Sequence, residues 1–158
     1  MPECDSKLPP GRPLHCLYVE DDSNDAFFAR HAFRKAAPEA SLIVVADGRE
    51  AQSYLLGSDA YGDRSRHPIP DLVLLDLKLP RMTGLEILEW MKSQPGLKEL
   101  PVFILSSSSE PSDVERAHAL GVSGYLSKKG NVGGLVELVR GLVAVAEGSR
   151  SRQAANRS

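Results

Sequence analysis

Short apolar runs alternate along the chain with longer stretches in which apolar residues recur every three or four positions. Short apolar runs bounded by turn residues are typical of buried strands, and the longer stretches are typical of amphipathic helices. The runs predict strands at 14–19, 41–45, 72–75, 102–105 and 123–126. The helical stretches lie at 23–37, 48–56, 84–93, 111–121 and 132–147. This strict alternation predicts an α/β fold: a five-stranded parallel sheet with five helices distributed over both faces.

Local signals support several of these boundaries. The run 72–75 is apolar at every position, which is typical of a central strand of a parallel sheet. Thr83 and Glu86 are spaced as a capping box that starts the third helix. Residues 57–70 are rich in turn formers and charges, so we expect an unusually long loop there.

The chain of 158 residues suits one domain. We expect that domain at 14–147, after a flexible N-terminal segment at 1–13 and before a disordered polar tail at 148–158. The net charge of -2 disfavours nucleic acid as the main partner. No apolar run approaches the roughly 20 residues that a membrane span needs, and the N-terminus lacks a secretory signal. We therefore expect a cytoplasmic protein.

Polar side chains follow four of the five expected strands. They are Glu20, Asp21 and Asp22 after the first strand, Asp76 after the third, Ser106 after the fourth and Lys128 after the fifth. Because the carboxyl ends of parallel strands meet at one edge of a sheet, we expect these groups to converge. Each has an ordinary structural explanation alone: Asp22, for example, could simply cap the following helix. Four strand ends bearing suitable groups together indicate a site.

The chemistry of such a site follows from its charges. Carboxylates gathered at one edge repel one another unless a cation neutralises them, and oxygen ligands favour Mg²⁺. A carboxylate can act as a nucleophile and hold a phosphoryl group as an aspartyl phosphate, while Mg²⁺ offsets the charge. A lysine and a hydroxyl can bind the phosphoryl oxygens. The pattern therefore indicates phosphoryl transfer to one of these carboxylates.

Several segments resemble the receiver domain of response regulators in two-component signalling, which has the flavodoxin-like fold. They are LYVEDD (17–22), LVLLDLKLPRMTGLEIL (72–88), PVFILSS (101–107) and GYLSKK (124–129). The resemblance implies a Mg²⁺ site in which Asp21 is a direct ligand and Glu20 acts through water. It further implies that Asp76 is the phospho-acceptor and a ligand, with Lys78 offering its backbone carbonyl to the metal.

The same resemblance assigns roles to three residues after the acceptor. Ser106 matches the switch hydroxyl that moves to the phosphoryl group, and Tyr125 matches the switch aromatic. Lys128 matches the lysine that pairs with the phosphoryl group. One position departs from the family: Lys129 stands where receivers usually have a proline, often with a cis peptide bond. A non-proline cis bond costs roughly 2.5–4 kcal/mol, so this loop is either trans or strained.

Within the family, the long 57–70 loop and the LDLKLP segment resemble single-domain receivers that serve phytochrome-type histidine kinases. The implied partners are such a sensor kinase and, downstream, a phosphotransfer protein or another target reached by protein contact. A receiver assists its own phosphorylation and dephosphorylation and has no separate enzymatic output.

The sequence argues against two other functions and leaves a third open. A dinucleotide-binding oxidoreductase needs a glycine-rich loop after the first strand, where this chain has Glu-Asp-Asp-Ser-Asn. A haloacid-dehalogenase-like phosphatase needs a second aspartate two residues after the nucleophile, where this chain has Lys78. A pseudo-receiver that binds proteins without phosphorylation remains the alternative.

The last helix carries two apolar stripes. Leu135, Leu138, Leu142 and Val145 can face the sheet, and a second stripe contains Val132, Val136, Val139 and Val143. An exposed apolar stripe commonly marks an interface, so we expect a homodimer through this helix. The alternative is a helix that lies deeper in its own core.

Overall fold

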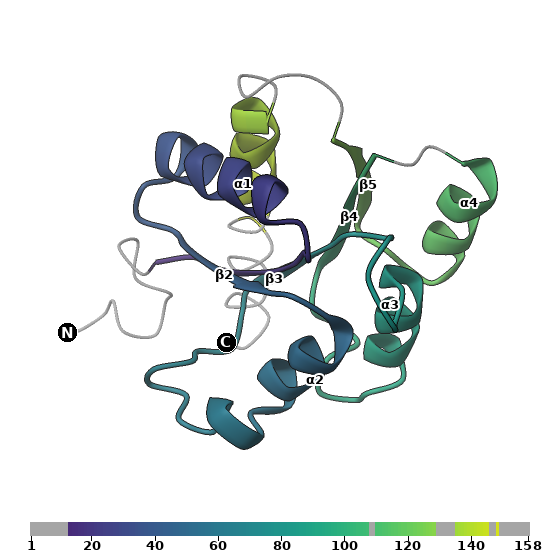
Figure 1. Ribbon diagram of the computed structural model, residues 1–158, viewed down its shortest axis with the longest axis horizontal. Coiled ribbons are helices and arrows are strands. Elements are labelled where there is room, and N and C mark those ends of the chain that lie inside the picture. The colour runs from purple at the N-terminus through teal and green to yellow at the C-terminus, as the bar shows by residue number, and fades with distance from the viewer. Residues whose placement is uncertain (1–12, 108–109, 129–134, 146–147, 149–158) are drawn as a thin grey trace.

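The computed structural model describes residues 13–107, 110–128, 135–145 and 148. In these residues, one parallel sheet has the strand order β2-β1-β3-β4-β5 (Figure 1). The strands are β1 (His15–Val19), β2 (Ser41–Val45), β3 (Leu72–Leu75), β4 (Val102–Ser106) and β5 (Gly124–Ser127). The order is that of flavodoxin-like folds, which confirms the predicted fold class.

Helices follow the strands in strict alternation. They are α1 (Ser23–Ala36), α2 (Gly48–Leu56), the short 3-10 helix η1 (Asp59–Tyr61), α3 (Gly84–Lys92) and α4 (Pro111–Ala119). Residues 135–145 are also helical. The boundaries follow local signals: the Asp22 side chain caps α1 by accepting from the backbone N–H groups of Asn24 and Asp25. Thr83 and Glu86 form the predicted capping box of α3.

The helices divide the apolar core into two layers. Helix α1 and the helix at 135–145 cover one face of the sheet, and α2, α3 and α4 cover the other (Figure 1). Alternate residues of each strand serve the two layers, as the two-residue period of a strand requires. On β1, for example, Leu17 and Val19 face α2 and α3, whereas Cys16 and Tyr18 face α1. All four residues of β3 are buried, as expected for a central strand.

The last helix packs differently from the expectation. Val136 and Val139, which we expected on an outward stripe, are buried at 9% and 1% exposure in the core beside α1. Val145, which we expected to face the sheet, is 50% exposed. The alternative of a deeper helix therefore holds for these valines. A helix that lies between a sheet and a neighbouring helix buries a wide arc, so adjacent stripes merge into one buried face. Val132 lies outside the described residues.

The loop at 57–70 is tied to α2 rather than extended into solvent. The Arg64 guanidinium donates hydrogen bonds to the backbone carbonyls of Tyr54 and Leu55, at 2.8 and 2.9 Å, and to that of His67 at 3.1 Å. The rings of Tyr54, Tyr61 and His67 pack together beside it, with centroids 5.0 to 6.0 Å apart. Arg64 thus donates to carbonyls of the last turn of α2, where a helix end leaves backbone acceptors with few intrahelical partners.

The two ends of the chain carry the predicted N-terminal segment and the predicted polar tail. Residues 1–12 and 149–158, which make up nearly all of the predicted N-terminal segment and polar tail, lie outside the described residues. The division into segments at 1–13, 14–147 and 148–158 therefore stays a prediction. Across the described part of the chain, none of the helices combines the length and apolarity that a bilayer crossing requires.

Candidate functional site

Three carboxylates meet at the carboxyl edge of the sheet. Glu20 and Asp21 directly follow β1, Asp76 directly follows β3, and these two strands are paired neighbours with Val19 opposite Leu75. One carboxylate oxygen from each of Glu20, Asp21 and Asp76 lies within 4.8 Å of the others. Glu20 and Asp76 are buried, at 3% and 6% exposure, whereas Asp21 is exposed. The predicted convergence of these residues is therefore present.

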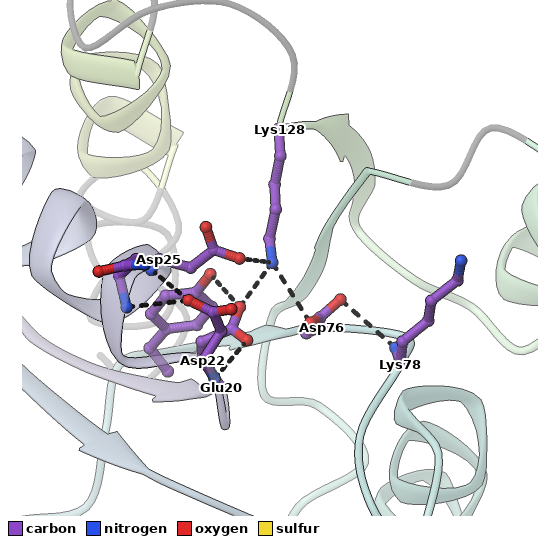
Figure 2. Close-up of polar contacts among 8 residues, drawn as sticks. Glu20, Asp22, Asp25, Asp76, Lys78 and Lys128 are labelled. Carbon is purple, nitrogen blue, oxygen red and sulfur yellow. Dashed lines mark hydrogen bonds and ion pairs between the residues drawn. The ribbon is translucent and has the colours of Figure 1, made fainter.

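Lys128 brings positive charge into this cluster. Its ammonium nitrogen lies 2.6 Å from Glu20 Oε1, 2.8 Å from Asp25 Oδ2 and 3.3 Å from Asp76 Oδ2 (Figure 2). The lysine directly follows β5, and its backbone N–H donates to the Ser106 carbonyl at 3.0 Å. The side chain therefore crosses from the far edge of the sheet to the end of β1 and bridges the acidic residues.

Glu20 is held by several donors at once. Its Oε1 accepts from Lys128 and from the Tyr18 hydroxyl at 2.8 Å, and its Oε2 accepts from the Asp22 backbone N–H at 3.1 Å. Burial raises the pKa of Glu20 above its ordinary 4.5, and it outweighs the lowering by those hydrogen bonds. The charged form of Glu20 thus depends on its donors.

The pKa values of Lys128 and Tyr18, which both donate to Glu20, are shifted by the same cluster of carboxylates. Burial lowers the pKa of Lys128, but hydrogen bonds to Asp25 and Glu20 and the charge of Asp76 raise it overall. The ammonium is therefore firmly protonated. Burial, and then the charge of Glu20, raise the pKa of the Tyr18 hydroxyl, so this group stays a neutral donor.

Asp25 and Tyr18 are members of the cluster that we did not predict. Asp25 lies in the first turn of α1. Its position four residues after Asp21 is the sequence signal that could have identified it as a member of the cluster. Tyr18 lies two residues before Glu20, so both side chains point to the same face of the strand. A tyrosine in an apolar strand is easily taken for a core residue, and its hydroxyl contact shows only in three dimensions.

The loop after β3 positions the Asp76 carboxylate. The Lys78 backbone N–H lies 3.4 Å from Asp76 Oδ1, and the Lys78 side chain points away from the acidic residues (Figure 2). The Gly84 N–H donates to the Leu77 carbonyl at 3.1 Å, which ties the start of α3 to the same loop. The role of the Lys78 backbone carbonyl as a metal ligand stays a prediction.

Ser106 lies on β4, which pairs with β3, and Tyr125 lies on β5, which pairs with β4. Ser106 is the last residue of β4 and is fully buried. Tyr125 lies opposite Ile104 in the register between β4 and β5, and it is half-buried against the core on the α2, α3 and α4 side. Their switch roles stay predictions. Lys129, on which the peptide-bond question depends, lies outside the described residues.

The donor set fits a hard divalent cation. Glu20, Asp21 and Asp76 offer only oxygen ligands, and two of these carboxylates are buried where unneutralised charge is costly. Lys128 neutralises part of that charge, which leaves the cluster net negative. The residues present can therefore hold Mg²⁺ or Mn²⁺ next to the Asp76 carboxylate.

Comparison with protein families identifies this arrangement. Residues 16–140 match the family model of the response regulator receiver domain. The chain belongs to that family. The match confirms the resemblance that the motifs suggested: the chain is a receiver domain of two-component signalling.

Among curated relatives of this receiver, the response regulator Rcp1 from Synechocystis sp. is 34% identical over 130 residues, which cover 82% of this chain and 86% of Rcp1. The solved structure of the phosphorylated cyanobacterial phytochrome response regulator RcpA matches with a TM-score of 0.76 at 34% identity, covering 83% and 91% of the two chains. The Mn²⁺-bound form of Rcp1 matches with a TM-score of 0.72 at 34% identity, covering 82% and 91%. The receiver is thus homologous to phytochrome response regulators.

Proposed function

We propose that this receiver is a phosphorylation switch in which Asp76 accepts a phosphoryl group from a histidine kinase with the help of Mg²⁺. One observation carries the proposal: a buried Asp76 carboxylate lies among two further carboxylates and 3.3 Å from the ammonium of Lys128. Glu20 is also buried beside Lys128, but its carboxylate oxygens already accept close hydrogen bonds from Lys128, the Tyr18 hydroxyl and the Asp22 N–H. Asp76 is held more loosely, by Lys128 at 3.3 Å and by the Lys78 N–H at 3.4 Å, which leaves its oxygens more available as nucleophiles.

The proposed transfer follows from the positions of these groups. An Asp76 carboxylate oxygen attacks the phosphorus of the kinase's phosphohistidine, a P–O bond forms, and the P–N bond breaks to release the imidazole. Mg²⁺, when bound, supplies positive charge that offsets the charge on the phosphoryl oxygens. Lys128 exchanges its hydrogen bond to Asp76 for one to a phosphoryl oxygen, and the Ser106 hydroxyl donates to another, with Tyr125 following as the switch aromatic.

The proposed partner is a phytochrome-type histidine kinase in the cytoplasm. The support is the homology to Rcp1 and RcpA and the similarity, at 33% identity and a TM-score of 0.69, to the bacteriophytochrome response regulator AtBRR. The signal then passes to a phosphotransfer protein or another target through protein contact, so the chain acts as a regulator rather than as an enzyme with its own substrate.

Labelling with a phosphorylated kinase or acetyl phosphate in the presence of Mg²⁺ tests the acceptor. Wild type should take up close to one phosphoryl group per chain, and Asp76→Asn should take up none. Asp113→Asn, which removes a carboxylate from α4, is the matched control and should label as wild type does. Labelling of Asp76→Asn elsewhere would contradict the assignment. A wild type that accepts nothing from any kinase of its genome would favour the pseudo-receiver.

We also propose a homodimer through the helix at 135–145. The proposal rests on the apolar side chains of this helix that are exposed or only partly buried. Val145 is 50% exposed, and Leu135, Leu138 and Val143 are only partly buried. The pair Val143→Glu and Val145→Glu should give monomers without loss of Asp76 phosphorylation. Wild type that is monomeric in light scattering at high concentration, phosphorylated or not, would contradict the dimer.

A further inference from the structure

The ammonium of Lys128 has three hydrogen-bond donors, and each has its own carboxylate acceptor. Glu20, Asp25 and Asp76 accept at 2.6, 2.8 and 3.3 Å (Figure 2). The lysine side chain is only 16% exposed, so it depends on these contacts more than a surface lysine would. Asp25 reaches the ammonium from α1, an element that carries none of the predicted site residues.

The three acceptors differ in what else they can do. Glu20 and Asp76 belong to the group of carboxylates that can hold a divalent cation, whereas Asp25 is outside that group. A cation that draws on Glu20 and Asp76 takes electron density from two partners of the lysine, and it also repels the ammonium directly. Of the three carboxylates that contact Lys128, Asp25 alone remains wholly available to it once the cation site is filled.

We propose that Asp25 is a positioning residue that keeps the Lys128 ammonium in the site when a divalent cation occupies the carboxylates of Glu20, Asp21 and Asp76. The inference rests on the proposed function, because the cation is part of that function. Without Asp25, the ammonium relies on Glu20 and Asp76 and competes with the cation for them. Asp25 thereby allows two positive groups to share one small cluster beside the acceptor.

The prediction is a loss of cation affinity at a residue that is not a ligand. Titration with Mn²⁺, followed by the electron paramagnetic resonance signal of the free ion, measures that affinity without any phosphorylation. Asp25→Asn keeps the size of the side chain and removes its charge, and it should weaken Mn²⁺ binding by about fivefold, as expected for a partly buried ion pair. Asp25→Glu, which retains a carboxylate, should recover most of the affinity.

Asp22→Asn is the matched control because Asp22 lies in the same turn and makes no contact with Lys128 in the described structure. Asparagine caps helices as well as aspartate does, so this variant removes one charge and leaves α1 intact. Asp22 is exposed, lies outside the group of candidate ligands and uses its carboxylate to cap α1, so the loss of its charge should change Mn²⁺ affinity by less than about twofold. A comparable loss in Asp22→Asn and Asp25→Asn would show a general charge effect and overturn the proposal.

A double-variant experiment tests whether Asp25 acts on cation binding through Lys128. In Lys128→Met, the Asp25→Asn change should lose most of its effect on Mn²⁺ affinity, because the ammonium it positions is gone. If Lys128→Met does not fold, Lys128→Gln provides the uncharged background. If Asp25→Asn has an undiminished effect in either Lys128 variant, the positioning role of Asp25 is overturned, while the proposed function is not affected. Failure of wild type to bind Mn²⁺ at all would instead contradict the proposed function.

Discussion

The backbone carbonyl oxygen of Asp76 lies directly against Gly84, where a β-carbon would stand only 2.2 Å from it. The first residue of α3 therefore touches the first residue of the β3–α3 loop, with no room for any side chain between them. The start of α3 and the proposed acceptor form one packed unit, so movement of either displaces the other.

This contact predicts that Gly84→Ala is strongly destabilising. The new methyl group must push α3 or the Asp76 backbone aside, which overpacking data place at about 1–3 kcal/mol or more in the free energy of unfolding. Gly96→Ala is the control, because nothing lies within 4 Å of a β-carbon there. Urea denaturation of the two variants checks this, and equal stabilities would contradict the close approach.

Tyr18→Phe should alter the acidic cluster without changing its carboxylates. The hydroxyl donates to Glu20 at 2.8 Å, so its removal should lower the free energy of unfolding by about 1 kcal/mol. That hydrogen bond also lowers the pKa of Glu20, so its loss should raise this pKa further. Because cation binding needs ionised Glu20, Mn²⁺ affinity should then fall at a higher pH on acidification than it does in wild type.

Tyr54→Phe is the control for that experiment. It also removes a hydroxyl from a buried tyrosine, which donates to the Pro68 carbonyl at 2.9 Å, far from the carboxylates. It should lower stability similarly and leave the pH dependence of Mn²⁺ binding unchanged. A shift of equal size in Tyr54→Phe and Tyr18→Phe would rule out a specific effect on Glu20.

The hydrogen bond between Tyr61 and Glu50 should make the free energy of unfolding fall at alkaline pH. Its hydroxyl donates to Glu50 Oε2 at 2.7 Å, and this bond, together with burial, raises the pKa of Tyr61 from 10.0 to about 12. The folded state favours the neutral phenol, so the contribution is complete below pH 10 and is lost as the pH rises through about 12. The stability difference between wild type and Tyr61→Phe, about 1 kcal/mol at neutral pH, should vanish over that interval.

Two measurements check this prediction. Urea denaturation of both proteins at several alkaline pH values gives the stability difference, and the ultraviolet absorbance of the phenolate gives the ionisation of Tyr61 itself. A stability difference that does not change with pH, or a tyrosine in that position that ionises at its ordinary pKa, would mean that the bond to Glu50 does not form in solution.

Arg64→Ala should detach the loop at 57–70 from α2. The guanidinium donates to three backbone carbonyls, and its loss should lower the free energy of unfolding by about 2 kcal/mol. The loop should also exchange its amide hydrogens faster. Arg66→Ala removes an exposed arginine of the same loop and should change stability by less than about 0.5 kcal/mol. Similar losses in both variants would contradict an anchoring role of Arg64.

The sequence by itself determined the elements and the edge of the sheet at which the charged residues gather. The bounds of β2, α2 and β3 agree with the expected ranges residue for residue, because apolar period and capping residues act over a few neighbouring positions. Glu20, Asp21, Asp76 and Lys128 could be brought together from sequence because parallel strands share one carboxyl edge. Each of these inferences depends on local signals and on a general rule of topology.

Only the tertiary structure decided how side chains meet across elements. The contacts of Tyr18 with Glu20 and of Asp25 with Lys128 depend on rotamers and on the distance between α1 and β5, which no local pattern contains. The burial of Val139 shows the same limit, because helical spacing identifies an apolar face but not the width of the surface that covers it. The position of a residue along the chain predicts that it lies near the carboxyl edge of the sheet. Which side chain it contacts there depends on how the helices and strands pack.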